Sequence, residues 1–260
     1  MDLIQTIVLA LVQGITEFLP VSSSGHLVLT PALFGWTDQG LAYDIAVHFG
    51  TLAAVIVYFR RDLADIVAAM LSGFSAEAKL GWQILLATVP LGIAGIVFAD
   101  VVETSLRSPA VIAVSSVVFG LLLWWADRAG RRERSEKRLS WRDVMLIGAS
   151  QALALIPGAS RSGVTMTAAL ALGLSRGAAG RFSFLLSIPA IGMVAAWQIV
   201  QLTQEPQAVD WLGLGLAAGL SALTAFASIA VFLNLIGRLG MGVFAVYRIA
   251  LALVIFAVLV

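Results

Sequence analysis

Six stretches of the sequence run for about 20 residues with almost no charged side chains. In a helix, about 20 apolar residues are needed to cross a hydrocarbon core roughly 30 Å thick. Membrane-spanning helices are therefore predicted at residues 41–59, 80–99, 108–126, 182–204, 211–237 and 241–260. Of all residues, 60% are hydrophobic and 12% are charged, whereas about 25% charged residues are usual in soluble domains. We expect an all-α polytopic membrane protein, with residues 1–260 forming a single integral membrane domain.

The composition excludes several other classes of protein. The mean hydropathy of +0.98 rules out a soluble Rossmann or barrel enzyme. A net charge of +1 without a basic face argues against a nucleic-acid partner. The absence of cysteine from the sequence excludes disulfides and thiolate chemistry. Met1-Asp2 lacks the basic start of a cleavable signal peptide, so we expect the first apolar stretch to stay in the mature chain.

Two further apolar regions are interrupted in the middle by helix-breaking residues. They cover residues 3–35 and 143–174, and their breaks, at 20–26 and 157–163, are rich in Pro, Gly and Ser. Each half is too short to span a membrane comfortably. We predict two re-entrant helical hairpins. Because irregular backbone at membrane depth is tolerated only against protein or a water-filled cavity, the breaks indicate a polar site.

Positive charge predicts the orientation of the chain in the membrane. The segment 127–142 is a basic loop and belongs in the cytoplasm by the positive-inside rule; its cations are Arg128, Arg131, Arg132, Arg134, Lys137, Arg138 and Arg142. Counting spans outward from this loop places both termini outside. The first hairpin then enters from outside and the second from the cytoplasm.

The two broken regions align with each other at an offset of 138 positions. The identical pairs are Gln13 with Gln151, Ser22 with Ser160, Ser24 with Ser162, and Gly25 with Gly163. Chance similarity between two Ser/Gly turns is the alternative. The shared helix, break, helix pattern favours an inverted-topology repeat, which places a binding site near the midplane. The first repeat would comprise residues 1–126 and the second residues 143–260.

Gln13 and Glu17 lie four residues apart and therefore on one face of the first half-helix. An ionised carboxylate inside a membrane hairpin is costly and indicates function by default. The alternative is a purely structural pairing of Glu17 with a buried basic residue such as Arg248.

Small polar residues gather where the second half-helix of each hairpin begins. Such helix starts attract anions through free N–H groups, hydroxyl donors and the helix dipole. Simple N-capping is the alternative, but Arg161 amid the serines needs an anion or a carboxylate partner. Two such helix starts facing each other, together with Arg161, would suit a group with two phosphates. The candidate substrate-binding residues are Gln13, Ser22, Ser24, Gly25, Ser160, Ser162, Gly163 and Thr165.

The chain has two histidines, and both lie close to these features. His26 could shuttle a proton, attack phosphorus, ligate a metal, or simply hydrogen-bond at a helix start. His48 lies within a predicted span, one turn after Asp44, and is interpreted as a supporting or structural residue.

With these residues identified, the chain resembles the bacterial undecaprenyl-diphosphate phosphatases, also called bacitracin-resistance proteins. Residues 13–26, QGITEFLPVSSSGH, are similar to the first signature of that family, and residues 157–165, PGASRSGVT, to its second. Smaller similarities at 44–52, 181–189 and Tyr247-Arg248 extend the resemblance over essentially the whole chain. Gln13 stands where many members have Glu, which bears on metal binding at that position.

The resemblance implies a hydrolase that removes the terminal phosphate from a C55 polyprenyl diphosphate with Mg²⁺ or Ca²⁺. It also implies an active site on the outer side of the bacterial cytoplasmic (inner) membrane, a role in recycling the lipid carrier for peptidoglycan synthesis, and bacitracin resistance.

We assign roles to the candidate residues on that basis. Arg161, with Ser160, Ser162 and Thr165, would clamp the phosphates. Glu17, helped by Gln13, would hold the divalent ion or act as base. Ser23 or His26 would supply the nucleophile or the proton relay, and the sequence does not decide between them. His48 and Arg248 would support this site.

A transporter or flippase for polyprenyl phosphate is the rival interpretation, because inverted repeats and broken helices are typical of transporters. A carrier needs Arg161 and the helix ends, whereas Glu17, Ser23 and His26 add groups that only chemistry requires. Small-residue runs at 213–219 and 237–242 favour helix packing and are consistent with a homo-oligomer.

Overall fold

The computed structural model describes residues 2–204 and 210–260, which form helices joined by short connections. Within these described residues, six helices are long and apolar enough to cross a membrane. They are α3 (Leu41–Tyr58), α5 (Ala76–Val97), α7 (Pro109–Ala129), α10 (Arg176–Gln204), α11 (Trp211–Leu239) and α12 (Gly242–Leu259). Each coincides with one of the six predicted stretches, so the prediction of an all-α multi-pass membrane protein is confirmed.

Both interrupted regions have the predicted helix, break, helix form. The first consists of α1 (Leu3–Thr16), a break at residues 17–22 and α2 (Ser23–Phe34). The second consists of α8 (Trp141–Gln151), the 3-10 helix η2 (Ala152–Leu155), a break at residues 156–160 and α9 (Arg161–Ala171). The four α-helices have only 14, 12, 11 and 11 residues. Their re-entry into the membrane remains a prediction.

Three short elements were not predicted: α4 (Arg60–Ser72), α6 (Ala99–Ser105) and η1 (Glu136–Arg138). Helix α4 begins with two arginines and an aspartate, and only its Ile66 is fully buried. A search for long apolar stretches does not find such a helix, because Arg60, Arg61, Asp62 and Asp65 interrupt its apolar residues.

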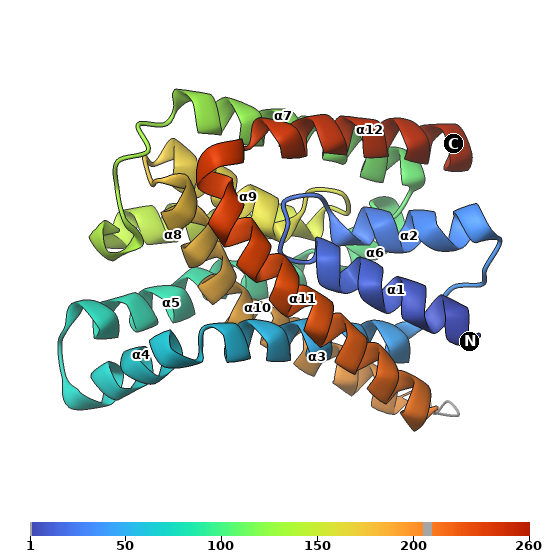
Figure 1. The fold of residues 1–260 in the computed structure, drawn as a ribbon, viewed down its shortest axis with the longest axis horizontal. Coiled ribbons are helices and arrows are strands. Elements are labelled where there is room, and N and C mark those ends of the chain that lie inside the picture. Colours follow the sequence, from blue (N-terminus) through green and yellow to red (C-terminus); the bar gives the residue numbers. More distant parts are fainter. Residues whose placement is uncertain (1, 205–209) are drawn as a thin grey trace.

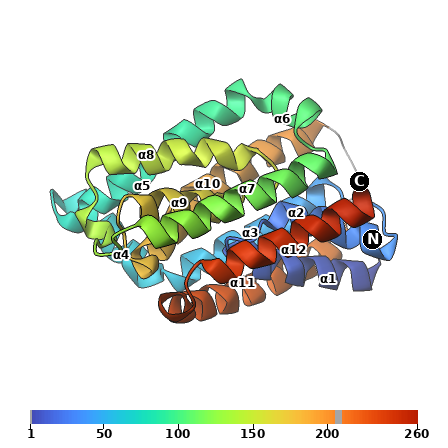
Figure 2. The same ribbon diagram turned by 90° about the horizontal axis from the view of Figure 1, so that it is seen from above.

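The helices are arranged as an elongated bundle with its two ends distinguished by charge. The amino and carboxyl termini lie at the same end, on the right of Figure 1, and the basic connection between α7 and α8 lies at the opposite end. Figure 2, turned by 90°, shows the same separation and shows α7 and α12 lying side by side. Termini on one face agree with the predicted even number of spans.

Helix packing follows a pattern that the predicted repeat requires. At the offset of 138, α1, α2 and α3 correspond to α8, α9 and α10. Helix α11 packs against α1 and α3, and its counterpart α5 packs against α8 and α10. Likewise α12 contacts α2, and α7 contacts α9. These matched contacts support the inverted repeat, which stays a prediction.

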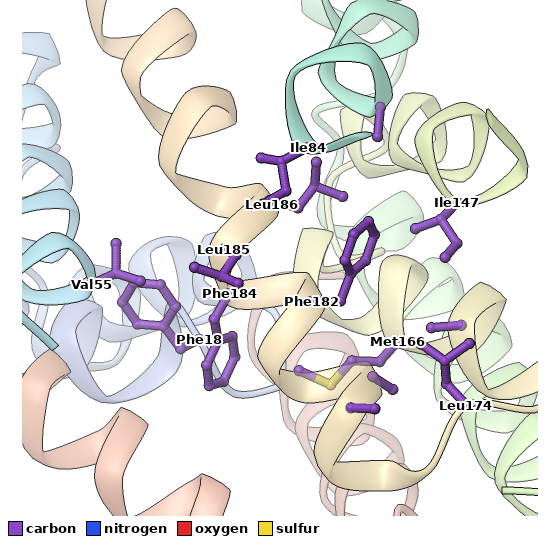
Figure 3. Packing of buried hydrophobic residues seen from close by; sticks show 14 of the residues in the cluster. Phe18, Val55, Ile84, Ile147, Met166, Leu174, Phe182, Phe184, Leu185 and Leu186 are labelled. Carbon is purple, nitrogen blue, oxygen red and sulfur yellow. The ribbon is translucent and has the colours of Figure 1, made fainter. Parts of the chain in front are cut away.

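The largest apolar core surrounds the amino-terminal half of α10, from Ala178 to Ile191, and Figure 3 shows part of it. Phe18, from the first break, packs edge-to-face on Phe184 of α10 with ring centroids 5.3 Å apart. Phe182 and Leu186 of α10 belong to the same cluster as Met166 of α9. The core therefore fixes both breaks against one continuous helix.

Glycine allows α3 to approach α11 closely. A Cβ atom at Gly50 would clash with the carbonyl oxygen of Ala218. Near this crossing Ser221 donates a hydrogen bond to the carbonyl of Val47, at 2.9 Å. Small residues at such contacts permit the close backbone packing typical of membrane helices.

Ion pairs fasten the basic loop to neighbouring helices. Arg181 of α10 pairs with Asp62 of α4 and, at 3.0 Å, with Glu136 of the loop. Arg134 pairs with Asp143 at 2.6 Å. The predicted loop at 127–142 is thus a folded connection.

The orientation can be tested with single cysteines, because the chain has none of its own. Ser105→Cys and Ser135→Cys are matched changes at exposed serines, the first at the end of α6, the second in the basic loop. If the basic loop is cytoplasmic, a membrane-impermeant maleimide added to intact cells will label Ser105→Cys and not Ser135→Cys. Both should react after permeabilisation. The opposite labelling pattern would show that the predicted orientation is inverted.

Candidate active site

The first break is built by Pro20 and Ser22. Pro20 lacks an N–H group and cannot continue the helix. Ser22 adopts a left-handed backbone conformation, with φ of 71°, and its hydroxyl accepts the N–H of Gly25 at 3.3 Å. This serine N-cap starts α2 and directs its amino terminus into the protein.

The second break repeats this geometry. Ser160 has φ of 69° and its hydroxyl accepts the N–H of Gly163 at 3.2 Å. Ser160 and Ser162 hydroxyls lie 3.1 Å apart, as Ser22 and Ser24 hydroxyls lie 3.2 Å apart. The residues that align in sequence therefore have the same local structure.

Hydrogen bonds join the two breaks to each other. Ser162 donates to the carbonyl of Leu19 at 2.9 Å, and the N–H of Gly158 donates to the hydroxyl of Ser24 at 3.3 Å. Of the predicted substrate-binding serines, Ser22 and Ser162 are buried and Ser24 is exposed. The structure thus brings both predicted halves of the site together.

Arg248 of α12 forms hydrogen bonds with the backbone of both breaks. Its side chain is fully buried, at 0% exposure. One Nη donates to Gly158 and Ala159 carbonyls at 2.7 and 3.0 Å, and the other to Pro20 at 3.4 Å. Arg248 forms no salt bridge among the described residues, so carbonyl dipoles stabilise its charge. Its predicted supporting position fits these contacts, and its predicted alternative pairing with Glu17 does not.

Glu17 is the centre of the polar site. Its Oε1 accepts a hydrogen bond from Arg161 at 3.1 Å, and the two side chains are only 8% and 12% exposed. Its Oε2 accepts from Gln13 and from the Ser23 hydroxyl, both at 3.0 Å. The Nε2 of His48 lies 3.9 Å from the same oxygen. Sequence-predicted residues from four helices therefore converge on one carboxylate.

His26 makes a separate set of contacts. Its Nδ1 lies 2.8 Å from the carbonyl of Ser22 and so carries the proton, which leaves Nε2 to accept from the Tyr247 hydroxyl at 2.6 Å. The two rings are stacked. The hydrogen bonds of the described chain do not connect His26 to Glu17 or Ser23. Sequence reasoning did not assign Tyr247 to the site, although the family resemblance covered it.

Thr165 is buried and its hydroxyl faces the protein interior. It contacts the hydroxyl of Ser183 at 2.7 Å and donates to the carbonyl of Arg161 at 2.9 Å. Arg161 also donates to the carbonyl of Ser183 at 3.4 Å. Ser183 was not assigned to the site, although the family resemblance at 181–189 covered it. Thr165 and Ser183 position Arg161.

The donor set suits a divalent cation only in combination with phosphate oxygens. The described residues contain no cluster of three or more His, Asp or Glu side chains. Glu17 supplies a single carboxylate, and Oε1 of Gln13 is buried without a hydrogen-bond partner. One carboxylate, one amide oxygen and substrate phosphates match the way in which Mg²⁺ is usually held.

These features define a class: a multi-pass helical membrane protein with a charged site between two broken helices. The family model described as bacitracin resistance protein BacA matches residues 6–254. The chain belongs to this family.

Curated relatives match over almost the full length. Undecaprenyl-diphosphatase 2 of Stutzerimonas stutzeri (strain A1501) is 53% identical, over 98% of this chain and 97% of its own. The undecaprenyl-diphosphatase of Teredinibacter turnerae (strain ATCC 39867 / T7901) is 51% identical, over 98% and 99%. That of Nitrosococcus oceani (strain ATCC 19707 / BCRC 17464 / JCM 30415 / NCIMB 11848 / C-107) is also 51% identical, over 98% of each chain.

Replacing Arg248 tests whether it holds the breaks together. Arg248→Met leaves the carbonyls of Ser116, Pro20, Gly158 and Ala159 without their charged donor, and we expect a loss of about 3 kcal/mol in unfolding free energy, measured by thermal unfolding in detergent. Arg238→Met removes an exposed arginine at the end of α11 and should leave stability nearly unchanged. Equal stability of the two variants would contradict the role of Arg248.

Proposed function

We propose that the chain hydrolyses undecaprenyl diphosphate to undecaprenyl phosphate and inorganic phosphate. This reaction recycles the lipid carrier for peptidoglycan synthesis and gives resistance to bacitracin. The observation that carries the proposal is the contact of one buried carboxylate, Glu17, with a guanidinium and a hydroxyl, those of Arg161 and Ser23. The family and the names of its relatives agree with this reaction.

Ser23 is proposed as the attacking group. Its hydroxyl already donates to Glu17, so the carboxylate can take the proton as Oγ attacks the terminal phosphorus. The bond from that phosphorus to the bridging oxygen breaks, and undecaprenyl phosphate leaves. After Glu17 has lost its proton to solvent, it activates a water that hydrolyses the phosphoserine and frees inorganic phosphate.

His26 is less suited to attack. Its Nδ1 proton is held by the Ser22 carbonyl and its Nε2 lone pair by Tyr247. Freed from Tyr247, Nε2 can accept a proton, so we assign His26 to proton relay.

Arg161 is proposed to bind the diphosphate and to stabilise charge on the transferred phosphoryl group. It begins α9, and Ser23 begins α2, so the positive ends of two helix dipoles lie at the same site. Ser24 supplies a further, exposed hydroxyl at the start of α2, whereas the Ser160 hydroxyl caps α9. Thr165 acts through Arg161 rather than on the phosphates.

A divalent cation, Mg²⁺ or Ca²⁺, would be held by Glu17 and by Oε1 of Gln13 together with phosphate oxygens. When bound, it supplies positive charge that neutralises the diphosphate.

We also propose that the two broken helices are re-entrant hairpins of an inverted repeat, with repeats at 1–126 and 143–260. The site would open to the outer face of the bacterial inner membrane, with both termini outside. The open surface at Gly215, Gly219 and Gly237 is available for a homo-oligomer contact.

A flippase for polyprenyl phosphate is the second candidate, supported by the equal geometry of the two breaks at Ser22 and Ser160. Measuring phosphate release distinguishes the two candidate functions. A phosphatase releases phosphate in detergent micelles, where no second compartment exists, and a carrier does not.

Substitutions of the proposed catalytic residues should lower activity without unfolding the protein. In detergent micelles, Ser23→Ala should lower kcat by about 10³-fold or more, and Arg161→Ala by about 10²-fold to 10³-fold. Thr167→Ala is the matched control, because its hydroxyl bonds only to a carbonyl of its own helix, and it should remain active. Normal turnover by Ser23→Ala would exclude Ser23 as nucleophile.

The covalent intermediate distinguishes Ser23 from His26. Quenching the reaction with a substrate labelled in its terminal phosphate should trap label on the protein that survives acid and is lost in base, as expected for phosphoserine. His26→Gln should still form it, since Glu17 and Ser23 remain in contact. Acid-labile label that disappears in His26→Gln would instead identify His26 as the nucleophile.

A further inference from the structure

A basic cavity of about 430 Å³ lies at the end of α7, where the basic loop begins. Its walls come from the last turns of α7, the start of α10 and the junction of α11 with α12. It shares no lining residue with the candidate active site. The proposed phosphatase reaction does not involve this cavity.

The floor of the cavity is a neutral ion pair. Arg176 binds Asp127 through two contacts, at 2.6 and 2.8 Å. The N–H of Met241 donates to the same carboxylate at 3.1 Å. The Asp127 side chain is only 4% exposed, and its carboxylate is paired directly with Arg176.

Two further arginines leave the cavity with surplus positive charge. Arg128 and Arg132 both line it and are exposed. Within residues 2–204 and 210–260, neither forms a salt bridge. Two guanidinium groups in one cavity favour a phosphate, which each can bind through charge-assisted hydrogen bonds.

The turn between α11 and α12 is shaped to cover this ion pair. Gly240 has φ of 72°, a conformation that favours glycine. A Cβ atom there would lie 3.0 Å from Nη2 of Arg176. The backbone therefore closes over the Arg176–Asp127 pair and holds the cavity wall in place.

One side of the cavity is apolar and continues toward the membrane. Trp124 lines it, with the Arg128 guanidinium 4.9 Å from the ring centroid. Tryptophan is typical of the membrane–water interface. Exposed Leu121 and Val243 extend the apolar surface along α7 and α12, which lie side by side (Figure 2). A ligand with both a phosphate and acyl chains matches this combination.

We propose that this cavity binds the headgroup of an anionic phospholipid. Arg128 and Arg132 bind its phosphate, Trp124 packs at the glycerol level, and the acyl chains lie along α7 and α12. Free phosphate offers the same anionic chemistry without the apolar part. The apolar flank favours the lipid as the source. The proposal depends neither on the phosphatase reaction nor on the orientation of the chain.

Native mass spectrometry of the purified protein in detergent tests the proposal, with dioleoylphosphatidylglycerol as probe and dioleoylphosphatidylcholine as zwitterionic reference. The wild type should retain the anionic lipid preferentially. Each arginine at a membrane surface contributes about fivefold in affinity, so Arg128→Gln/Arg132→Gln should weaken phosphatidylglycerol binding about 25-fold. Its binding of phosphatidylcholine should not change.

Arg61→Gln/Arg138→Gln is the matched control. It removes the same charge from exposed positions at the same end of the bundle, outside the cavity, and should retain the lipid. Phosphate release in lipid-free micelles checks that both double variants are folded. Equal loss of lipid in the two variants, or equal retention of both lipids by the wild type, would overturn the proposal. Full displacement of the lipid by inorganic phosphate alone would also overturn it, in favour of a soluble anion.

Discussion

Buried backbone N–H and C=O groups need hydrogen-bond partners, and the structure depends on how this need is met at the two breaks. The two breaks expose carbonyls that no helix satisfies. Arg248 meets this need at Pro20, Gly158 and Ala159. Because one guanidinium serves both breaks, they have to lie together. The charged groups beside the breaks are brought together as a consequence.

For the same reason, some hydroxyl groups of the site form hydrogen bonds within the protein, and only the others can bind a ligand. Ser22 and Ser160 cap helices, Ser162 satisfies a carbonyl of the other break, and Thr165 bonds inside the core. Much of what looks in the sequence like a phosphate-binding surface is therefore internal support. In the proposed reaction, Glu17, Arg161 and Ser23 are the residues that act on the substrate. Their ion pair is kept out of bulk water, where it would be screened.

The basic end of the molecule follows a different principle. Carboxylates on α4, α5 and α7 neutralise some of its cations, including Arg176 and Arg181, and so fasten the loop to the bundle. Arg128 and Arg132 are not used in this way. The arginines of the predicted cytoplasmic side therefore fall into two groups. Some form ion pairs that stabilise the fold, and others line the cavity without an ion-pair partner among the described residues.

The sequence by itself determined the six spans and the two breaks, because hydropathy, length and helix-breaking residues act locally. It also identified Glu17 and Arg161, since charges are rare in such segments. Only the tertiary structure decided their partners. Tyr247 reaches His26 across 221 positions, and Ser183 supports Thr165 from another helix. Such pairings depend on how helices cross, and helix crossing is fixed by packing between surfaces that are distant in the chain.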